Sequence, residues 1–237
     1  MYLLYSFKHT CFVLWVLLFT CACVALTAVA WGQEKDKKAS IDEKEPILDN
    51  LLNKIEKRYA GPGFSAEFKQ QSTIAAMEIT DNASGKLFVK RPGKMRWEYV
   101  QPESQIIISD GDDLWIYRKE DNQVMLGKAP SFFANGKGAG FLSDLKTLRT
   151  EFTITLEGKD DKENQIIKLV PKKESVELTR IHMTVSSQTD TIDQIVTLNG
   201  YGDETQIDIS QYHFNQELPD DMFLFEIPDG AEVLQMD

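Results

Sequence analysis

The side chains best suited to catalysis or metal binding are few in this 237-residue sequence, and they lie far apart. Apart from His9, the histidines are His182 and His213, which fall on different predicted strands without a partner at metal-ligand spacing. The acidic pairs Asp112-Asp113 and Asp220-Asp221 fall in predicted turns, where a solvated carboxylate is the ordinary interpretation. A glycosidase would instead need two carboxylates at a set separation in a polar cleft. We therefore predict two structural histidines and no metal site.

Nucleophilic catalysis and nucleotide binding have equally little support. All three cysteines, Cys11, Cys21 and Cys23, lie in an N-terminal segment expected to be removed, so the mature chain would have no thiolate or disulfide. No Gly-x-Ser-x-Gly elbow occurs. The glycine-rich stretch 136–140 lacks the spacing and the Ser/Thr of a phosphate loop, and the third glycine of a dinucleotide fingerprint. We expect no enzyme and no cofactor, and a hydrolase is the weakest alternative.

Composition and charge describe a globular protein without a nucleic-acid partner. Hydrophobic residues make up 42% and charged residues 27% of the chain, which is ordinary for a soluble domain. The formal net charge is −11, and no Lys/Arg cluster stands clear of neighbouring acids. A duplex-binding protein needs a basic surface, so this class is excluded.

Residues 1–30 have the features of an export signal. Lys8 and His9 precede the apolar run 11–30, which ends in Ala28-Val29-Ala30, and these small residues suit cleavage after Ala30. We predict a signal peptide over 1–30, a flexible polar tail over 31–45 and a single domain over 46–237. The apolar run is also long enough to span a bilayer, so an uncleaved anchor is the alternative.

The remaining candidate for function is an apolar surface built on strands, within residues 84–117. Pro92-Gly93 and Asp110-Gly111 are turn signals. Between them, apolar residues alternate with charged ones in the period of a strand, and the runs 106–108 and 114–117 are apolar on both faces. Strands that are apolar on both faces must be packed against other parts of the protein on each side of the sheet. The candidates for a concave apolar face are Met95, Trp97, Tyr99, Ile107, Trp115 and Tyr117, together with Phe64 and Phe68; an ordinary packed core is the alternative.

The elements predicted around this block are mostly strands. A helix over 46–60 carries one apolar stripe, with Pro46 at its start and Gly61 after its last turn. Strands are predicted over 64–79, 123–126, 152–157, 165–170, 176–186, 191–199, 203–214 and 222–227, with a turn at 81–85. Many evenly spaced strands with few helices predict one antiparallel, barrel-like sheet.

Residues 129–148 interrupt this rhythm of strands. Phe132 and Phe133 precede a glycine-rich stretch, which is followed by a short predicted helix over 141–148 that carries Phe141 and Leu145 on one side. One interpretation is a surface loop with a packed helix. The other is a movable lid that covers the open side of a curved sheet.

The block that begins at Lys90 resembles the LolA family, the outer-membrane lipoprotein carrier proteins of the Gram-negative periplasm. The matching residues are Lys90–Tyr99, Gln101-Pro102, Ser109–Gly111 and Leu114–Tyr117, in order and at the right spacing. The resemblance implies a mainly β (α+β) fold: an incomplete, half-open antiparallel β-barrel whose helices form a lid over an apolar cavity for acyl chains. The segment 129–148 and the long N-terminal tail depart from the family pattern.

The resemblance also implies particular residues and partners. Arg91 would hydrogen-bond the lid in the closed state and release it on loading, although a solvated strand-end arginine is the alternative. Ile55, or Leu52 one turn away, would support closure. A monomeric, soluble periplasmic carrier would accept acylated lipoproteins from an inner-membrane ABC-type release complex and deliver them to an outer-membrane acceptor lipoprotein. The alternatives are an anchored LolB-like acceptor and a periplasmic lipid- or peptide-binding sensor of the same fold.

Overall fold

The computed structural model describes residues 45–130 and 137–236. The chain divides into two compact units, Met1–Asp49 and Asn50–Asp237. In the first unit the described residues, 45–49, are helical. This helix continues to residue 58, where the sequence predicted one over 46–60. The predicted signal peptide lies outside the described residues, as does the predicted tail except for Glu45.

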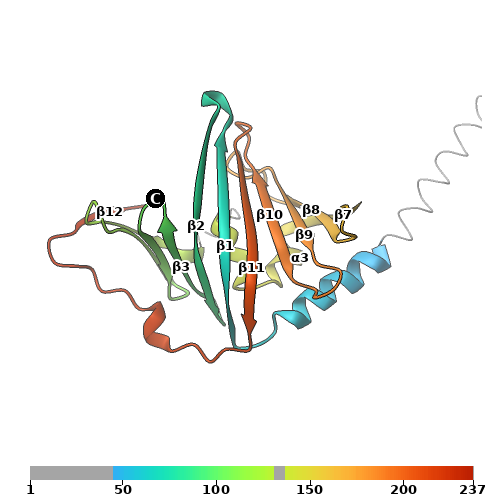
Figure 1. The fold of residues 1–237 in the computed structure, drawn as a ribbon, viewed down its shortest axis with the longest axis horizontal. Helices are drawn as coiled ribbons and strands as arrows, with labels where there is room; N and C mark the ends of the chain where they lie inside the picture. The colour runs from blue at the N-terminus through green and yellow to red at the C-terminus, as the bar shows by residue number, and fades with distance from the viewer. Residues whose placement is uncertain (1–44, 131–136, 237) are drawn as a thin grey trace, which may run out of the picture. The chain divides into compact units, whose positions relative to one another are not determined.

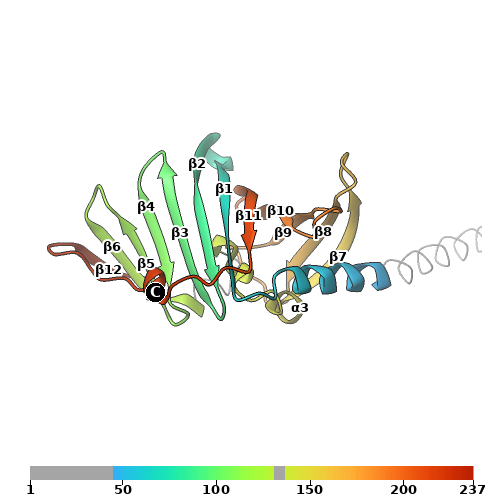
Figure 2. The ribbon, with the colours of Figure 1, turned by 60° about the horizontal axis from the view of Figure 1, so that its bottom comes forward.

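The second unit is built on one twelve-stranded sheet (Figure 1, Figure 2). Its spatial order is β12-β6-β5-β4-β3-β2-β1-β11-β10-β9-β8-β7, and the two edge strands do not pair with each other, so the sheet is open. The mainly β prediction is confirmed. The strands are β1 Gly63–Ile74, β2 Ile79–Lys90, β3 Lys94–Gln101, β4 Gln105–Ser109, β5 Asp113–Arg118, β6 Gln123–Lys128, β7 Phe152–Lys159, β8 Gln165–Pro171, β9 Arg180–Val185, β10 Ile192–Leu198, β11 Glu204–Phe214 and β12 Glu232–Gln235.

One pairing in this sheet runs against the prediction of a purely antiparallel arrangement. β12 pairs with β6 in parallel, whereas the other recorded neighbours are antiparallel, so the sheet is mixed. Residues 215–231 carry the chain from β11, in the middle of the sheet, to β12 at the edge beside β6. Along this connection lies the 3-10 helix η3, Asp220–Phe223, so the strand predicted over 222–227 is wrong.

Two other predicted boundaries are wrong. The turn expected at 81–85 lies inside β2, because β1 and β2 pair continuously up to Ile74 and Ile79. The reversal is made by the short helix η1, Ala75–Met77, and by Glu78, whose φ is 55°. Cross-strand pairing therefore overrides the turn preference of Asp81 and Asn82. The strand predicted over 176–186 is also shorter, since β9 begins at Arg180.

The pairing register assigns each side chain to one of two faces, because residues directly opposite on neighbouring strands point to the same side. One face carries apolar residues along the sheet, and we call it the apolar face. On β1–β6 its apolar members are Phe64, Ala66, Phe68, Leu87, Val89, Met95, Trp97, Ile107, Leu114, Ile116 and Met125. On the other half it continues through Ile207, Ile195, Met183 and Ile167, each at most 4% exposed.

The opposite face differs between the two halves of the sheet. On β7–β9 it is polar: Glu157 forms ion pairs with Lys168 and His182 at 3.2 and 3.0 Å. On β3–β6 it carries further apolar residues, and the connection 215–231 packs there. Phe223 of this connection is fully buried, and Arg96 donates a hydrogen bond to the Met222 carbonyl at 3.1 Å. The connection thus supplies the second cover that the two-sided apolar strands require.

The helical segments lie outside the sheet. They include η2, Lys137–Leu142, and α3, Thr147–Glu151, which together replace the single helix predicted over 141–148. Arg149 of α3 binds Glu56 and Asn53 on the N-terminal helix at 2.7 and 2.9 Å. Leu142, Leu145 and Leu148 are at most 3% exposed, so this segment contributes to the core.

Candidate functional site

Most of the predicted lining residues share the apolar face. Phe68 packs its ring edge-on against Trp97 and Tyr99, with centroids 4.7 and 4.9 Å apart. Ile107 lies directly opposite Trp97 in the register, and Met95 follows on the same face of β3. Phe64 lies nearer the start of β1 and is 1% exposed. These residues form one continuous apolar surface over β1–β4.

Trp115 and Tyr117 do not belong to this surface, which corrects their predicted grouping. Trp115 pairs with Ile108 and Tyr117 with Ile106, both of which point away from the side of Ile107. Both rings pack instead against Phe225 of the C-terminal connection, with centroids 6.2 and 5.6 Å away. Because the run Leu114–Tyr117 is apolar on both faces, its sequence does not reveal which of its residues point to the apolar face of the sheet.

Several residues of the apolar face were not predicted. Leu87 and Val89 of β2 and Leu114 of β5 are fully buried, and Ile116 is 7% exposed. In β2 no clear alternation marked Leu87 and Val89, because Phe88 between them is also apolar, and in β5 the larger aromatic residues drew the assignment to the wrong face. The register shows that smaller aliphatic side chains complete the surface beside Trp97.

A cleft of about 440 Å³ opens at one end of this surface. Its walls are the β2–β3 and β4–β5 turns and the helical segment; the lining residues include Gly93, Gly111, Ala129, Phe141, Ser143 and Phe152. Gly93 has φ 70°, and a methyl group there would lie 3.3 Å from the Gly111 Cα. The two turns therefore touch, and this contact sets the edge of the cleft.

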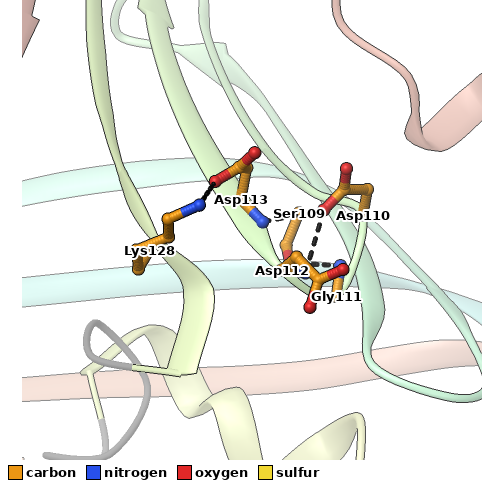
Figure 3. A network of polar contacts seen from close by, with 6 residues as sticks. All are labelled: Ser109, Asp110, Gly111, Asp112, Asp113 and Lys128. Atoms are coloured by element: carbon orange, nitrogen blue, oxygen red, sulfur yellow. Dashed lines mark hydrogen bonds and ion pairs between the residues drawn. The ribbon is translucent and has the colours of Figure 1, made fainter.

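The acidic turn beside the cleft is held by several polar contacts (Figure 3). Asp110 Oδ1 accepts hydrogen bonds from the backbone N–H groups of Asp112 and Asp113 at 2.9 and 2.8 Å. Ser109 Oγ accepts from the Gly111 N–H at 3.1 Å, and Lys128 pairs with Asp113. The Asp110 carboxylate thus orders the turn. Of the predicted acidic pair, Asp112 lies between β4 and β5, whereas Asp113 is the first residue of β5 and pairs with Lys128 of β6.

Arg91 joins the sheet to the helical segment. Its Nη1 donates to the Ser143 carbonyl at 2.9 Å, and its Nη2 lies 3.4 Å from the Leu142 carbonyl. Burial lowers the pKa of the guanidinium, and the carboxylate of Asp144 opposes this shift. An arginine is suited to this position because its planar fork reaches two backbone carbonyls at once.

The other residues predicted for closure lie in the core where they are described. Ile55 and Leu52 of the N-terminal helix are 1% and 4% exposed, and Phe141 and Leu145 are 5% and 3% exposed. Phe132 and Phe133 lie outside the described residues. The described part of the predicted lid, residues 137–148, is thus packed and attached through Arg91 in this conformation.

A second attachment joins the end of the N-terminal helix to the sheet. Tyr59, which is 2% exposed, packs edge-on against Phe64 with centroids 5.3 Å apart. Its hydroxyl accepts a hydrogen bond from the Ile192 N–H at 2.9 Å, and the Tyr212 hydroxyl donates to the Ile192 carbonyl at 2.6 Å. Burial raises the pKa of both tyrosines far above the ordinary value, and that of Tyr99 to about 12.

These raised pKa values predict a loss of stability in alkali. An unfolded tyrosine ionises near pH 10, whereas these native phenols stay neutral, so the stabilisation is complete below about pH 10 and is lost as the pH rises towards the folded values. Above pH 10, each such tyrosine should lower the free energy of unfolding by about 1.4 kcal/mol per pH unit. Urea unfolding at a series of pH values between 8 and 11.5 would measure this slope. The double variant Tyr59→Phe/Tyr212→Phe should show a shallower slope; an unchanged slope would contradict the assignment.

The predicted histidines and acidic pairs do not come together as a metal site in the part of the chain that the structure describes. Three or more potential metal ligands do not gather anywhere among these residues. His182 pairs with Glu157, and His213 lies opposite Ser65 in β1. Asp220 is paired with Lys94 and Lys90 at 2.6 and 3.1 Å, which lowers its pKa. None of the helices within 45–130 and 137–236 has the length and apolar character to cross a bilayer.

Comparison with known proteins shows which family this chain is similar to. The model of the outer membrane lipoprotein carrier protein family, LolA, matches residues 62–226. An outer-membrane lipoprotein carrier protein of Chromobacterium violaceum is 31% identical over 173 residues, which cover 73% of this chain and 81% of the relative. The corresponding protein of Cupriavidus pinatubonensis is 26% identical and covers 90% of this chain and 96% of its own.

A solved structure supports the fold alone. The crystal structure of an uncharacterized conserved protein from Thermus thermophilus superimposes with a TM-score of 0.52 at 11% sequence identity. The match covers 80% of this chain and 99% of the other.

Proposed function

Because this chain belongs to the LolA family of outer-membrane lipoprotein carrier proteins, we propose that its apolar face takes up the acyl chains of a lipoprotein in the periplasm. The carrier function is that of the family, and it involves no chemical step. The observation that supports the proposed site is the continuous apolar face of β1–β6, held closed at one end by the bonds of Arg91 to residues 142 and 143.

The physical reason lies in the transfer of methylene groups. Moving each CH₂ of an acyl chain from a membrane into water costs about 0.8 kcal/mol of free energy. A carrier must offset this cost by burying the chain against its own apolar surface. In this conformation Leu87, Val89 and Leu114 are already fully buried. Loading therefore has to displace groups that cover them, and the segment 137–148 is the candidate because polar bonds from Arg91 attach it to the sheet.

Arg91 then acts as a latch between an empty closed state and a loaded open state. Two hydrogen bonds to carbonyl oxygens keep the empty carrier from exposing its apolar face, and they are short-range bonds that break on a small displacement. A ligand shifts such an equilibrium only by its differential affinity for the two states. Acyl chains bind only the open state, so loading and latch release are coupled.

The partners follow from the same proposal. The family implies lipoprotein cargo and the periplasm. We assign residues 1–30 to a cleaved export signal and residues 46–237 to one carrier domain. The cargo would come from an ABC-type release complex of the inner membrane and pass to an acceptor lipoprotein of the outer membrane.

A direct binding experiment tests the proposal. The purified protein is mixed with a triacylated lipopeptide in detergent, which is then diluted below its critical micelle concentration. We expect the lipopeptide to elute with the monomeric protein in size-exclusion chromatography, with the non-acylated peptide as control. If the lipopeptide aggregates while the protein elutes empty, acyl-chain binding is refuted. Mass spectrometry of the exported protein separately decides whether residues 1–30 are removed.

A further inference from the structure

The register divides the apolar face of β2–β6 into three rows that run across the strands. The first row, beside the Gly93 and Gly111 turns, holds Val89, Met95, Ser109, Leu114 and Gly127. The second holds Leu87, Trp97, Ile107, Ile116 and Met125. The third, at the far end, holds Gly85, Tyr99, Gln105, Arg118 and Gln123. The face thus changes from apolar to polar at the third row.

The polar row is organised by side-chain contacts. The Tyr99 hydroxyl donates to Gln70 Oε1 at 2.9 Å, and Arg118 donates to Gln123 Oε1. Arg118 also pairs with Asp121 at 3.4 Å. A cleft of about 270 Å³ opens here, lined among others by Tyr99, Gln105, Arg118 and Pro102. This end can therefore accept polar groups and solvent, unlike the second row.

Trp97 stands one row inside this boundary, and its indole N–H is not satisfied. The side chain is 2% exposed, and Nε1 has no hydrogen-bond partner in the described part of the chain. Its neighbours in the register are Leu87 and Ile107, and the ring of Phe68 packs edge-on against it. Buried donors are nearly always paired in folded proteins, because an unpaired one loses its bond to water.

We propose that Trp97 Nε1 donates a hydrogen bond to an ester carbonyl oxygen of the bound lipid. This inference rests on the proposed function, in which the apolar face holds acyl chains. An ester carbonyl is an acceptor only, so it suits a donor in apolar surroundings. The ester linkages then lie at the second row, the chains run towards the Gly93 and Gly111 turns, and the polar cysteinyl peptide leaves over Tyr99 and Arg118.

The assignment gives the site an orientation and a specificity that an apolar surface alone lacks. Ether-linked alkyl chains, which carry no carbonyl, would be held by burial but not by this bond. The polar row, with Gln105 and Arg118, adds donors for the peptide backbone. A site built to hydrogen-bond an oxygen discriminates against the analogue that lacks it, because the donor is then left unpaired.

The test compares two ligands and two variants. The ligands are a diacylated lipopeptide, whose chains are ester-linked, and its dialkyl analogue, whose chains of equal length are ether-linked. Trp97→Phe keeps an aromatic ring against Phe68 and removes the N–H donor together with part of the indole volume, and the lost volume is the same for both ligands. Trp115→Phe, on the opposite face, is the matched control. Affinities are measured by competition with a fluorescent lipopeptide.

The wild-type protein should bind the ester about tenfold more tightly than the ether, which is about 1.4 kcal/mol. Trp97→Phe should lose this preference and bind both ligands with the affinity of the ether, while Trp115→Phe should keep it. A preference retained by Trp97→Phe, or an equal loss for both ligands, would overturn the inference. If the wild-type protein binds neither ligand, acyl-chain binding itself fails.

Discussion

Replacing Arg91 by leucine should raise the affinity for lipopeptide and impair its release. The variant loses two hydrogen bonds from a charged donor to the Leu142 and Ser143 carbonyls. Such bonds contribute about 2 kcal/mol, so the ratio of open to closed protein should rise about 30-fold. Because only the open state binds, the apparent affinity rises with its population until that state predominates. Binding assays and transfer to acceptor membranes would measure the two effects.

Amide hydrogen exchange tests independently whether Arg91 holds the segment 137–148 against the sheet. The amides of residues 143 and 144, which bond to Gly140 and Phe141 carbonyls, should exchange faster in Arg91→Leu than in the wild-type protein. Arg96→Leu is the matched control, since Arg96 also binds a backbone carbonyl, that of Met222, but on the opposite face. Equal affinity and equal protection in both variants would show that Arg91 does not hold the segment closed.

Placing a carboxylate on the apolar face should strongly weaken lipopeptide binding. Ile107→Glu puts the charge beside Trp97, where bound acyl chains would desolvate it, and we expect a loss of about 100-fold, or 2.7 kcal/mol. Ile106→Glu changes the adjacent residue, which is also half-buried but belongs to the opposite face beside Tyr117. It should bind almost as the wild-type protein does.

This pair of variants separates binding from folding. Both substitutions introduce the same side chain on the same strand, and circular dichroism and thermal unfolding would show whether each remains folded. Equal losses of affinity in two folded variants would show that the acyl chains do not lie on the face of Trp97. Loss in Ile106→Glu alone would move the site to the side of Trp115.

The sequence was sufficient for the features that depend on local order. Alternation of apolar and charged residues between Pro92 and Gln101 predicted β3, and the turn residues on either side limited its length. The spacing of apolar residues predicted the N-terminal helix almost to its ends. The scarcity of paired nucleophiles and bases gave an enzyme little support, and the ordered motif from Lys90 to Tyr117 indicated the family.

The tertiary structure decided how segments that are distant in the chain pair with one another. Alternation gives a strand two faces, but only the register with β3 and β4 shows that Trp115 joins Ile108 and that Ile116 joins Trp97. The turn expected at 81–85 became strand because β1 offered a full set of backbone partners. These outcomes depend on pairing free energy, which a local pattern does not contain.

The same holds for the candidate site. Arg91 could be singled out from its motif, but its acceptors lie 51 and 52 residues further along the chain. The cover over Trp115 comes from Phe225, and the polar row that follows Trp97 joins residues of five strands. Local residue order thus determined which side chains alternate, and long-range packing determined which of them meet, because contact free energy depends on neighbours that only the folded chain brings together.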